Sequence, residues 1–278
     1  MPLRRTALPA FAVLTLQALA IHGDHAFAAA SSSGSGSGSY DTQHAVHWDA
    51  GGMDFAWDAK HTKNAYVASG AFNVNKTIVT GIKVANKGEI FVTVPRWFDG
   101  VPATLNKVAL AADGGTAQNP VLTPWPSWDM NAIGNCSALQ YLQSMEIDND
   151  GIMWALDVGL VNTIGGPTST TCPPKMVFID TQTGDTVGDP YIFPNDVFNH
   201  TSGFPNDLVI DNAAQVAYIS DTSDYGNGAI IVFDRINRKS RRFHDDTMKA
   251  DTTGDIDWSS ITYPQSSAGF QTTPQDGI

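Results

Sequence analysis

The chain has 278 residues, of which 42% are hydrophobic and 10% aromatic, so it holds enough apolar side chains to build one globular core. Its formal net charge is −12 and its isoelectric point is near 4.7. Nucleic acid and anionic membrane surfaces would be repelled by such a charge, which argues against both as partners. A cationic small molecule is compatible with it, and the sequence leaves the oligomeric state open.

Residues 1–30 have the pattern of a secretory signal peptide. Two arginines precede a short apolar run, and a group of alanines then supplies an A-x-A cleavage site. The apolar run of about 15 residues falls short of the ~20 that a membrane-spanning helix needs, although a membrane anchor is the alternative. Residues 31–40 are rich in serine and glycine, which predicts a flexible linker before folded structure over 41–278. We therefore expect a secreted, extracellular protein without a membrane anchor.

A repeat of about 63 residues runs through the middle of the chain. The apolar residues Val84, Ile147 and Ile210 lie in the predicted first strand of three successive units, and each is 63 positions from the next. Each unit reads as a strand, a polar turn, a second strand, a longer loop, a third strand and a possible fourth strand. Short antiparallel strands in fours, with almost no helical periodicity, are typical of a β-propeller. A β-sandwich or an unrelated β-barrel is the alternative.

Two cysteines and three sequons mark sites of covalent modification in an exported chain. Cys136 and Cys172 are 36 residues apart, and a bridge between them would remove loop entropy worth roughly 3 to 4 kcal/mol. The sequence favours this disulfide over the alternative of two buried free thiols. Asn-x-Ser/Thr triplets at Asn75, Asn135 and Asn199 would accept N-glycans where the host attaches them.

One stretch carries a family signature. Residues 91–105 read F-V-T-V-P-R-W-x-x-G-V-P-A-T-L, a strand that runs into a proline-bounded loop. Further segments in matching order and spacing are Pro124–Trp128, Cys136–Gln140, Cys172–Lys175, Asn206–Val209 and Tyr218–Asp221. In these segments the chain resembles the yellow / major royal jelly protein family. It departs from many insect members at 148–153, where they carry a cysteine and an arginine, which indicates a non-insect branch.

The resemblance implies a fold and a complete blade count. Members of the family are secreted six-bladed β-propellers, and they carry cysteines at the positions of the two found here. Residues 41–278 hold about four repeat units, and Asp276-Gly277-Ile278 resembles the start of a further first strand. We therefore expect an all-β chain with six-bladed β-propeller architecture, C-terminally truncated to about four blades.

In a propeller the first strand of each blade lines the central channel, where ligands bind. Asn206 and Asp207 open one such strand, Ser144 holds the equivalent place one blade earlier, and Asp221 is a further candidate counter-ion. Polar groups that converge on the axis could hold a cationic amine. The alternative is that these aspartates cap turns and accept backbone N–H groups. Arg96 could hold a carboxylate, although a structural ion pair is its default role.

Family members are associated with amine binding in the channel, with dopachrome conversion, or with nutritive and pheromonal roles. We expect a protein that binds a small aromatic or amine ligand, of the class of biogenic amines or catechol derivatives, and that needs no cofactor. The alternative is an extracellular enzyme. A dopachrome-type tautomerase needs a general base and a donor for the enolate, and no pair can be assigned, so catalytic residues are unknown. A lactonase-like hydrolase would hold calcium or another divalent cation, with Asn206 and Asp276 as ligands.

Overall fold

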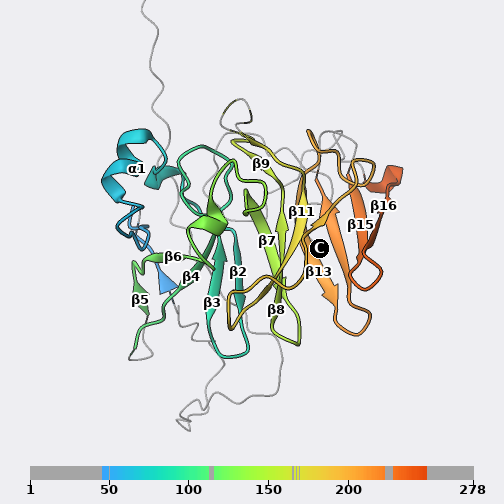
Figure 1. Ribbon diagram of the computed structural model, residues 1–278, viewed down its shortest axis with the longest axis horizontal. Coiled ribbons are helices and arrows are strands. Elements are labelled where there is room, and N and C mark those ends of the chain that lie inside the picture. Colours follow the sequence, from blue (N-terminus) through green and yellow to red (C-terminus); the bar gives the residue numbers. More distant parts are fainter. Residues whose placement is uncertain are drawn as a thin grey trace, which may run out of the picture.

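The computed structural model describes residues 46–49, 51–112, 116–164, 166, 168, 170–222 and 228–248. The predicted signal peptide at 1–30, the linker at 31–40 and Asp276 lie outside these residues. The described part consists mainly of short strands, as Figure 1 shows.

Three four-stranded antiparallel sheets make up the body of the molecule, and in each the strands follow chain order. The first sheet is β2 (Gly81–Val84), β3 (Ile90–Thr93), β4 (Leu105–Val108) and β6 (Leu122–Pro124). The second is β7 (Leu142–Ile147), β8 (Ile152–Asp157), β11 (Lys175–Asp180) and β12 (Tyr191–Ile192). The third is β13 (Pro205–Asp211), β14 (Val216–Asp221), β15 (Ala229–Asp234) and β16 (Lys239–Phe243). Four-stranded sheets of this topology are propeller blades, so the prediction of an all-β propeller-type fold is confirmed.

The sequence repeat corresponds to contacts between blades. β7 packs beside β2 on one side and beside β13 on the other, so the first strands of the three sheets are neighbours (Figure 1). Residues at equivalent positions therefore meet. The Thr80 hydroxyl donates to the Gln143 carbonyl at 3.3 Å, and the Asn149 N–H donates to Asn212 Oδ1 at 2.8 Å, each across 63 residues of sequence. The repeat thus fixes which residues of neighbouring blades touch.

Two core layers lie between the sheets, because alternate residues of a strand face opposite neighbours, and a further buried cluster joins the first sheet to the segment before it. Between the first and second sheets the buried residues include Phe91, Leu105, Leu142, Met153 and Val177. Between the second and third sheets an aromatic group takes their place: Trp154, Phe178, Tyr191, Phe193 and Phe233. The Trp154 and Phe178 rings meet edge to face at 5.1 Å, a preferred geometry for aromatic pairs.

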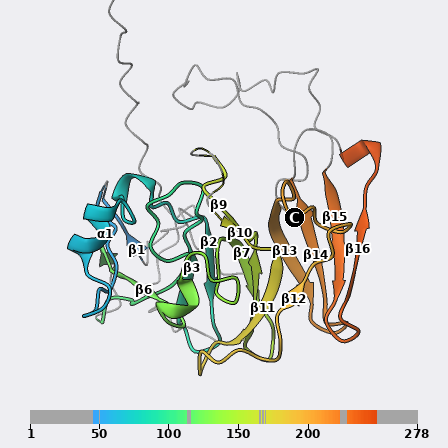
Figure 2. The ribbon, with the colours of Figure 1, turned by 45° about the horizontal axis from the view of Figure 1, so that its top comes forward.

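The segment before the first sheet covers that sheet's outer side. It contains α1 (Lys63–Ser69), η1 (Val74–Lys76) and β1 (Val46–His47), which pairs in parallel with β5 (Ala117–Gln118). Figure 2 shows α1 and β1 at one end of the row of sheets and β16 at the other. The sequence did not predict α1, which has seven residues and buries none of them. No described helix has the length and apolarity required to cross a membrane.

Short elements fill the connections between the blade strands. The hairpin β9 (Leu160–Val161) and β10 (Thr170–Thr171) joins β8 to β11. The 3₁₀ helix η2 (Asp129–Asn131) follows β6, and η3 (Asp246–Met248) follows β16.

Candidate ligand-binding site

Ser144 and Asp207 occupy the same position in neighbouring first strands, and the structure brings their side chains together. The Ser144 hydroxyl donates a hydrogen bond to Asp207 Oδ1 at 2.5 Å. The same oxygen accepts the N–H of Leu208 at 2.9 Å, while the Asp207 N–H donates to the Ser220 hydroxyl at 3.0 Å. The bonds from Ser144 and Leu208 hold Oδ1 of the carboxylate, and the third bond holds the backbone of Asp207. The second carboxylate oxygen, Oδ2, takes part in none of these three bonds.

A β-bulge lies at each of these positions. The pairing of β7 with β8 shifts register between Leu142 and Met145, and that of β13 with β14 shifts between Pro205 and Leu208. A bulge interrupts the alternation of side chains and re-aims the residues within it, and bulges are over-represented next to functional sites. Ser144, Asn206 and Asp207 all lie within these two bulges. Their directions are therefore set by the bulges and not by the regular pleat.

Aromatic residues stand directly before both bulged strands. Tyr141 precedes β7, Phe204 precedes β13, and their rings meet edge to face at 5.7 Å. The Tyr141 hydroxyl donates to Gln143 Oε1 at 3.1 Å, and burial raises the pKa of this phenol well above its ordinary value. Val158 and Leu160 complete the buried part of this cluster. The two bulged strands that carry Ser144 and Asp207 thus start from one largely buried aromatic cluster.

Asp221, the further counter-ion candidate, already has a cationic partner. It is buried at the end of β14, where it forms an ion pair with Arg242 and accepts the Phe204 N–H at 3.0 Å. Its carboxylate holds the start of β13 in place. We therefore carry Ser144, Asn206 and Asp207 forward as ligand contacts and treat Asp221 as a positioning residue.

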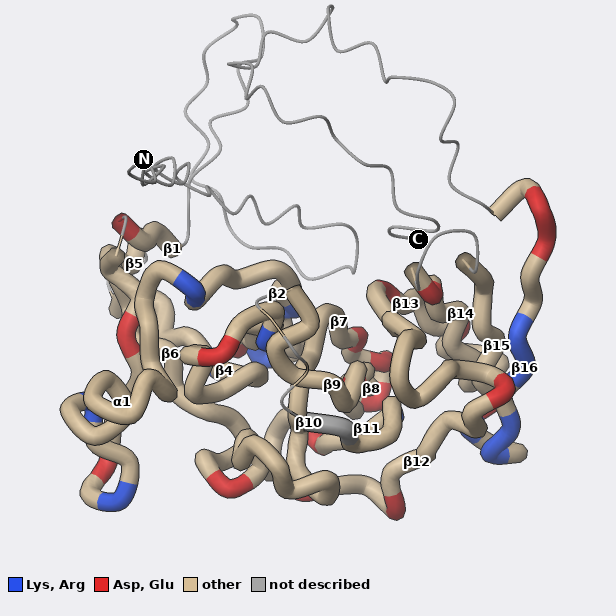
Figure 3. Tube along the Cα trace, turned by 90° about the horizontal axis from the view of Figure 1, so that it is seen from above, with Lys and Arg blue, Asp and Glu red and all other residues tan. Residues whose placement is uncertain are grey.

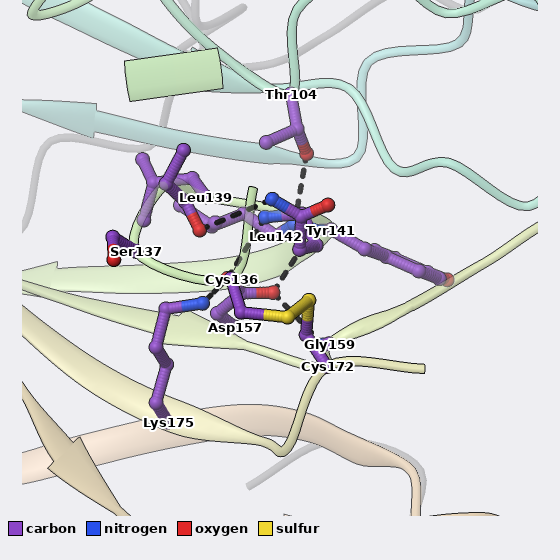
Figure 4. A network of polar contacts seen from close by, with 12 residues as sticks. Thr104, Cys136, Ser137, Leu139, Tyr141, Leu142, Asp157, Gly159, Cys172 and Lys175 are labelled. Atoms are coloured by element: carbon purple, nitrogen blue, oxygen red, sulfur yellow. Dashed lines mark hydrogen bonds and ion pairs between the residues drawn. A yellow bond between two sulfur atoms is a disulfide. The ribbon is translucent and has the colours of Figure 1, made fainter. Parts of the chain in front are cut away.

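Asp157 is the equivalent of Asp221 in the second sheet, and Figure 4 shows its surroundings. It pairs with Lys175 Nζ at 2.6 Å, and both side chains are buried. Its two oxygens also accept the N–H groups of Gln140, Tyr141 and Gly159 at 2.8 to 2.9 Å. The carboxylate thereby fixes the chain just before β7, as Asp221 does before β13. This pair could not be predicted from the sequence, because its members are separated by 18 residues and a hairpin.

Arg96 has a structural role without an ion pair. It is fully buried, and its guanidinium donates to five backbone carbonyls, those of Val101, Pro102, Asn131, Leu139 and Gln140, at 2.6 to 3.1 Å. Burial lowers its pKa to about 10. All five N–H donors are occupied, so the carboxylate-binding role considered for Arg96 has no free donor in this structure.

Charged residues of both signs are spread over the described part of the molecule. Figure 3 shows acidic positions around β7, β8 and β13, towards the first strands, and basic positions along the outer strand β16. Among the described residues, no three His, Cys, Asp or Glu side chains come together in a group that could hold a metal ion. Asp276, the predicted partner of Asn206 in a metal site, lies outside those residues, so calcium binding stays a prediction.

The predicted disulfide is confirmed. Cys136 and Cys172 are bonded, with their Cα atoms 5.3 Å apart, and the bridge lies beside the Asp157 carboxylate (Figure 4). The asparagines of the three sequons, Asn75, Asn135 and Asn199, are all exposed. Their glycosylation stays a prediction.

Comparison with known proteins identifies the relatives of the chain. The family model described as Major royal jelly protein matches residues 142–277. Protein yellow of Drosophila erecta is 30% identical over 210 residues, which make up 74% of this chain and 37% of that protein. Protein yellow of Drosophila guanche is 30% identical over 197 residues, or 68% of this chain and 33% of that protein. The chain thus spans about a third of the length of these relatives.

Solved structures give weaker matches. A puromycin hydrolase aligns with a TM-score of 0.32 and 12% identity, covering 62% of this chain and 22% of the hydrolase. A virginiamycin B lyase from Staphylococcus aureus aligns with a TM-score of 0.30 and 15% identity, covering 61% and 56% of the two chains. At these scores neither structure bears on the site, and the blade assignment depends on the sheets themselves.

Proposed function

Because the chain belongs to the yellow / major royal jelly protein family, we propose that it is a secreted propeller protein that binds a small aromatic amine through Ser144, Asn206 and Asp207. The proposal covers biogenic amines and amines derived from catechols. Secretion is supported by the Cys136–Cys172 bridge, since disulfides persist in oxidising compartments, and by the signal-like sequence at 1–30.

The observation that carries the proposal is the state of the Asp207 carboxylate. Asp148, Asp157 and Asp221 each pair with a lysine or arginine, whereas no ion pair to Asp207 exists within the described residues. Asp207 is nevertheless held in a fixed direction by Ser144 and by the bulge of β13. A pre-positioned carboxylate without a cation can accept a ligand ammonium at little cost in side-chain entropy.

The surroundings suit the rest of such a ligand. Phe204, half-buried at the start of β13, offers aromatic surface to a ring or to a cation, and its ring contacts that of the buried Tyr141. The net charge of −12 adds a long-range attraction for cations. No observation favours the tautomerase or the lactonase alternative, and we assign no catalytic residues.

A thermal-shift titration of the full chain tests the proposal, with dopamine, serotonin and calcium in separate samples. A ligand at about 100 times its dissociation constant should stabilise the protein by roughly 2.7 kcal/mol. We expect a shift with at least one amine, its loss in Asp207→Asn, and its retention in Asp211→Asn. Asp211 is a matched control in the same strand, where its carboxylate caps a turn, a role that asparagine also fills.

Two outcomes would contradict the proposal. The first is that neither amine raises the melting temperature. The second is that the Asp207→Asn variant responds as fully as the parent chain. A shift with calcium alone would instead support the metal hypothesis that involves Asn206.

A further inference from the structure

A surface pocket of about 570 Å³ lies at the outer edge of the first sheet. Its walls come from two segments that are far apart in sequence. One is residues 56–61, which precede α1, and the other is residues 123–129, which start within β6 and continue into the loop after it. In the first sheet β6 is the fourth strand and β2 the first, so the width of the sheet separates this pocket from the first-strand site (Figure 1). The pocket therefore needs an explanation of its own.

His61 is held in this pocket by three contacts. Its Nδ1 lies 3.0 and 3.1 Å from the two carboxylate oxygens of Asp58, and its backbone N–H donates to Asp58 Oδ1 at 2.7 Å. The imidazole also stacks on the Trp128 indole, with ring centres 4.6 Å apart and planes inclined by 10°. Hydrogen bonds from His61 lower the pKa of Asp58, so the carboxylate is ionised at neutral pH. In the neutral imidazole this places the proton on Nδ1 and leaves Nε2 as an acceptor.

Two ring nitrogens in the pocket have no use in the fold. Neither His61 Nε2 nor the indole N–H of Trp128 has a hydrogen-bond partner in the part of the chain that the structure describes. The fold does not need the His61–Asp58 pair to position Trp128, because the Phe55 and Trp57 rings also pack against the indole. Both residues line the pocket, so its wall contains an acceptor and a donor that the described part of the fold does not use.

The remaining lining carries charges of both signs and is open to water. Asp58 and Asp129 supply carboxylates, Lys60 an ammonium and Ser127 a hydroxyl, and all four residues are exposed. The apolar part of the lining consists of Ala56, Ala59, Pro124 and Trp128. A ligand that carries only positive or only negative charge would be repelled by at least one group in this wall. A ligand that carries many hydroxyls, each both donor and acceptor, and an apolar C–H face would match it.

We propose that this pocket is a carbohydrate-binding site, in which His61 Nε2, the Trp128 indole N–H and the Asp129 carboxylate bond to sugar hydroxyls. A pocket that is open to solvent suits a segment of an oligosaccharide better than an enclosed small molecule. The site is independent of the amine site, and either can exist without the other.

Binding can be measured on the full chain by tryptophan fluorescence and by NMR of the histidine ring. The probes are cellohexaose, chitohexaose and maltohexaose, each at concentrations up to about 10 mM, which detects even millimolar affinity. We expect a saturable change with at least one of them, and a shift of the His61 ring signals in the same titration. The Asp207→Asn variant should bind the sugar as the parent chain does.

Three variants locate the site. His61→Phe keeps the stack on Trp128 but removes both ring nitrogens, and Asp129→Asn removes one exposed charge. Each should weaken sugar binding about 10-fold, because His61→Phe loses one hydrogen bond and Asp129→Asn replaces a charged acceptor with a neutral one, with the melting temperature little changed. Asp196→Asn, an exposed residue remote in sequence from both pocket segments, is the matched control and should bind normally. The proposal is overturned if no probe gives a saturable change, or if His61→Phe and Asp129→Asn both bind as tightly as the parent chain.

Discussion

The second and third sheets have the same strand pattern but different surroundings. Trp154 is the third residue of β8 and Tyr218 the third residue of β14, so they are equivalent positions of the repeat. Trp154 is fully buried against the third sheet, whereas Tyr218 is 41% exposed. Val209 and Phe243 lie on the same face as Tyr218 and are also exposed. The comparison shows that the neighbour packed on a blade, and not the pattern of its strands, decides how much an aromatic residue stabilises it.

The same two sheets also differ in the cation that neutralises an equivalent buried aspartate. Each ends its second strand with a buried aspartate that fixes the start of the blade's first strand. In the second sheet the cation is Lys175 on the third strand, 1% exposed, and in the third sheet it is Arg242 on the fourth strand, 23% exposed. Solvent can reach the second pair and not the first, so the two pairs should respond differently when broken.

The largest contrast is expected between the two aromatic positions. Trp154→Ala should lower the free energy of unfolding by about 3 to 5 kcal/mol, because it opens a cavity in the core. Tyr218→Ala should change it by less than about 1 kcal/mol, as is usual for exposed positions. Urea denaturation of both variants measures the difference. Equal losses would mean that Tyr218 is as well packed as Trp154 in solution.

A smaller contrast is expected between the two ion pairs. Lys175→Met leaves Asp157 buried without a cation and should cost about 3 to 5 kcal/mol. Arg242→Met should cost less, about 1 to 3 kcal/mol, since water can reach the vacated side of Asp221. Chemical denaturation at neutral pH provides both values, and the double variant Asp157→Asn/Lys175→Met should recover part of the first loss. A costlier Arg242→Met would contradict the assigned difference in burial.

The smallest effect concerns Tyr141, whose equivalent in the third sheet is Phe204. Burial raises the pKa of Tyr141 in the folded chain, so its contribution to stability is complete below the ordinary tyrosine pKa of about 10 and is lost as the pH rises above it. Tyr141→Phe makes the second sheet resemble the third at this position. We expect it to cost about 1 kcal/mol at neutral pH and to make the alkaline fall in melting temperature shallower. An unchanged alkaline fall would show that this phenol ionises freely in the folded chain.

Much of the fold could be predicted because the sequence repeat and the short strand patterns are local features of the chain. The 63-residue period fixed the first strands, and with them the neighbours Ser144 and Asp207. The bulges that aim these two side chains could not be predicted, since a bulge depends on the partner strand. α1 lacks an apolar stripe and therefore has no helical periodicity to detect.

Partners that are distant in sequence were also beyond prediction. Asp221 is a plausible ligand residue in the sequence, and its pairing with Arg242 becomes visible when β14 and β16 are placed in one sheet. The stack of His61 on Trp128 joins two segments with no shared motif. In both cases a local pattern specifies the strand or turn, while the three-dimensional arrangement specifies which side chains meet.

The most direct test of the central claim is a double-mutant cycle on Ser144 and Asp207, with serotonin and dopamine binding measured by isothermal titration calorimetry. If Ser144 acts by orienting the Asp207 carboxylate, Ser144→Ala and Asp207→Asn should each weaken binding of the bound amine about 10-fold or more, and the double variant should bind no more weakly than Asp207→Asn alone. Losses that add independently, or an affinity unaffected by Asp207→Asn, would contradict the account of a carboxylate pre-positioned for an amine.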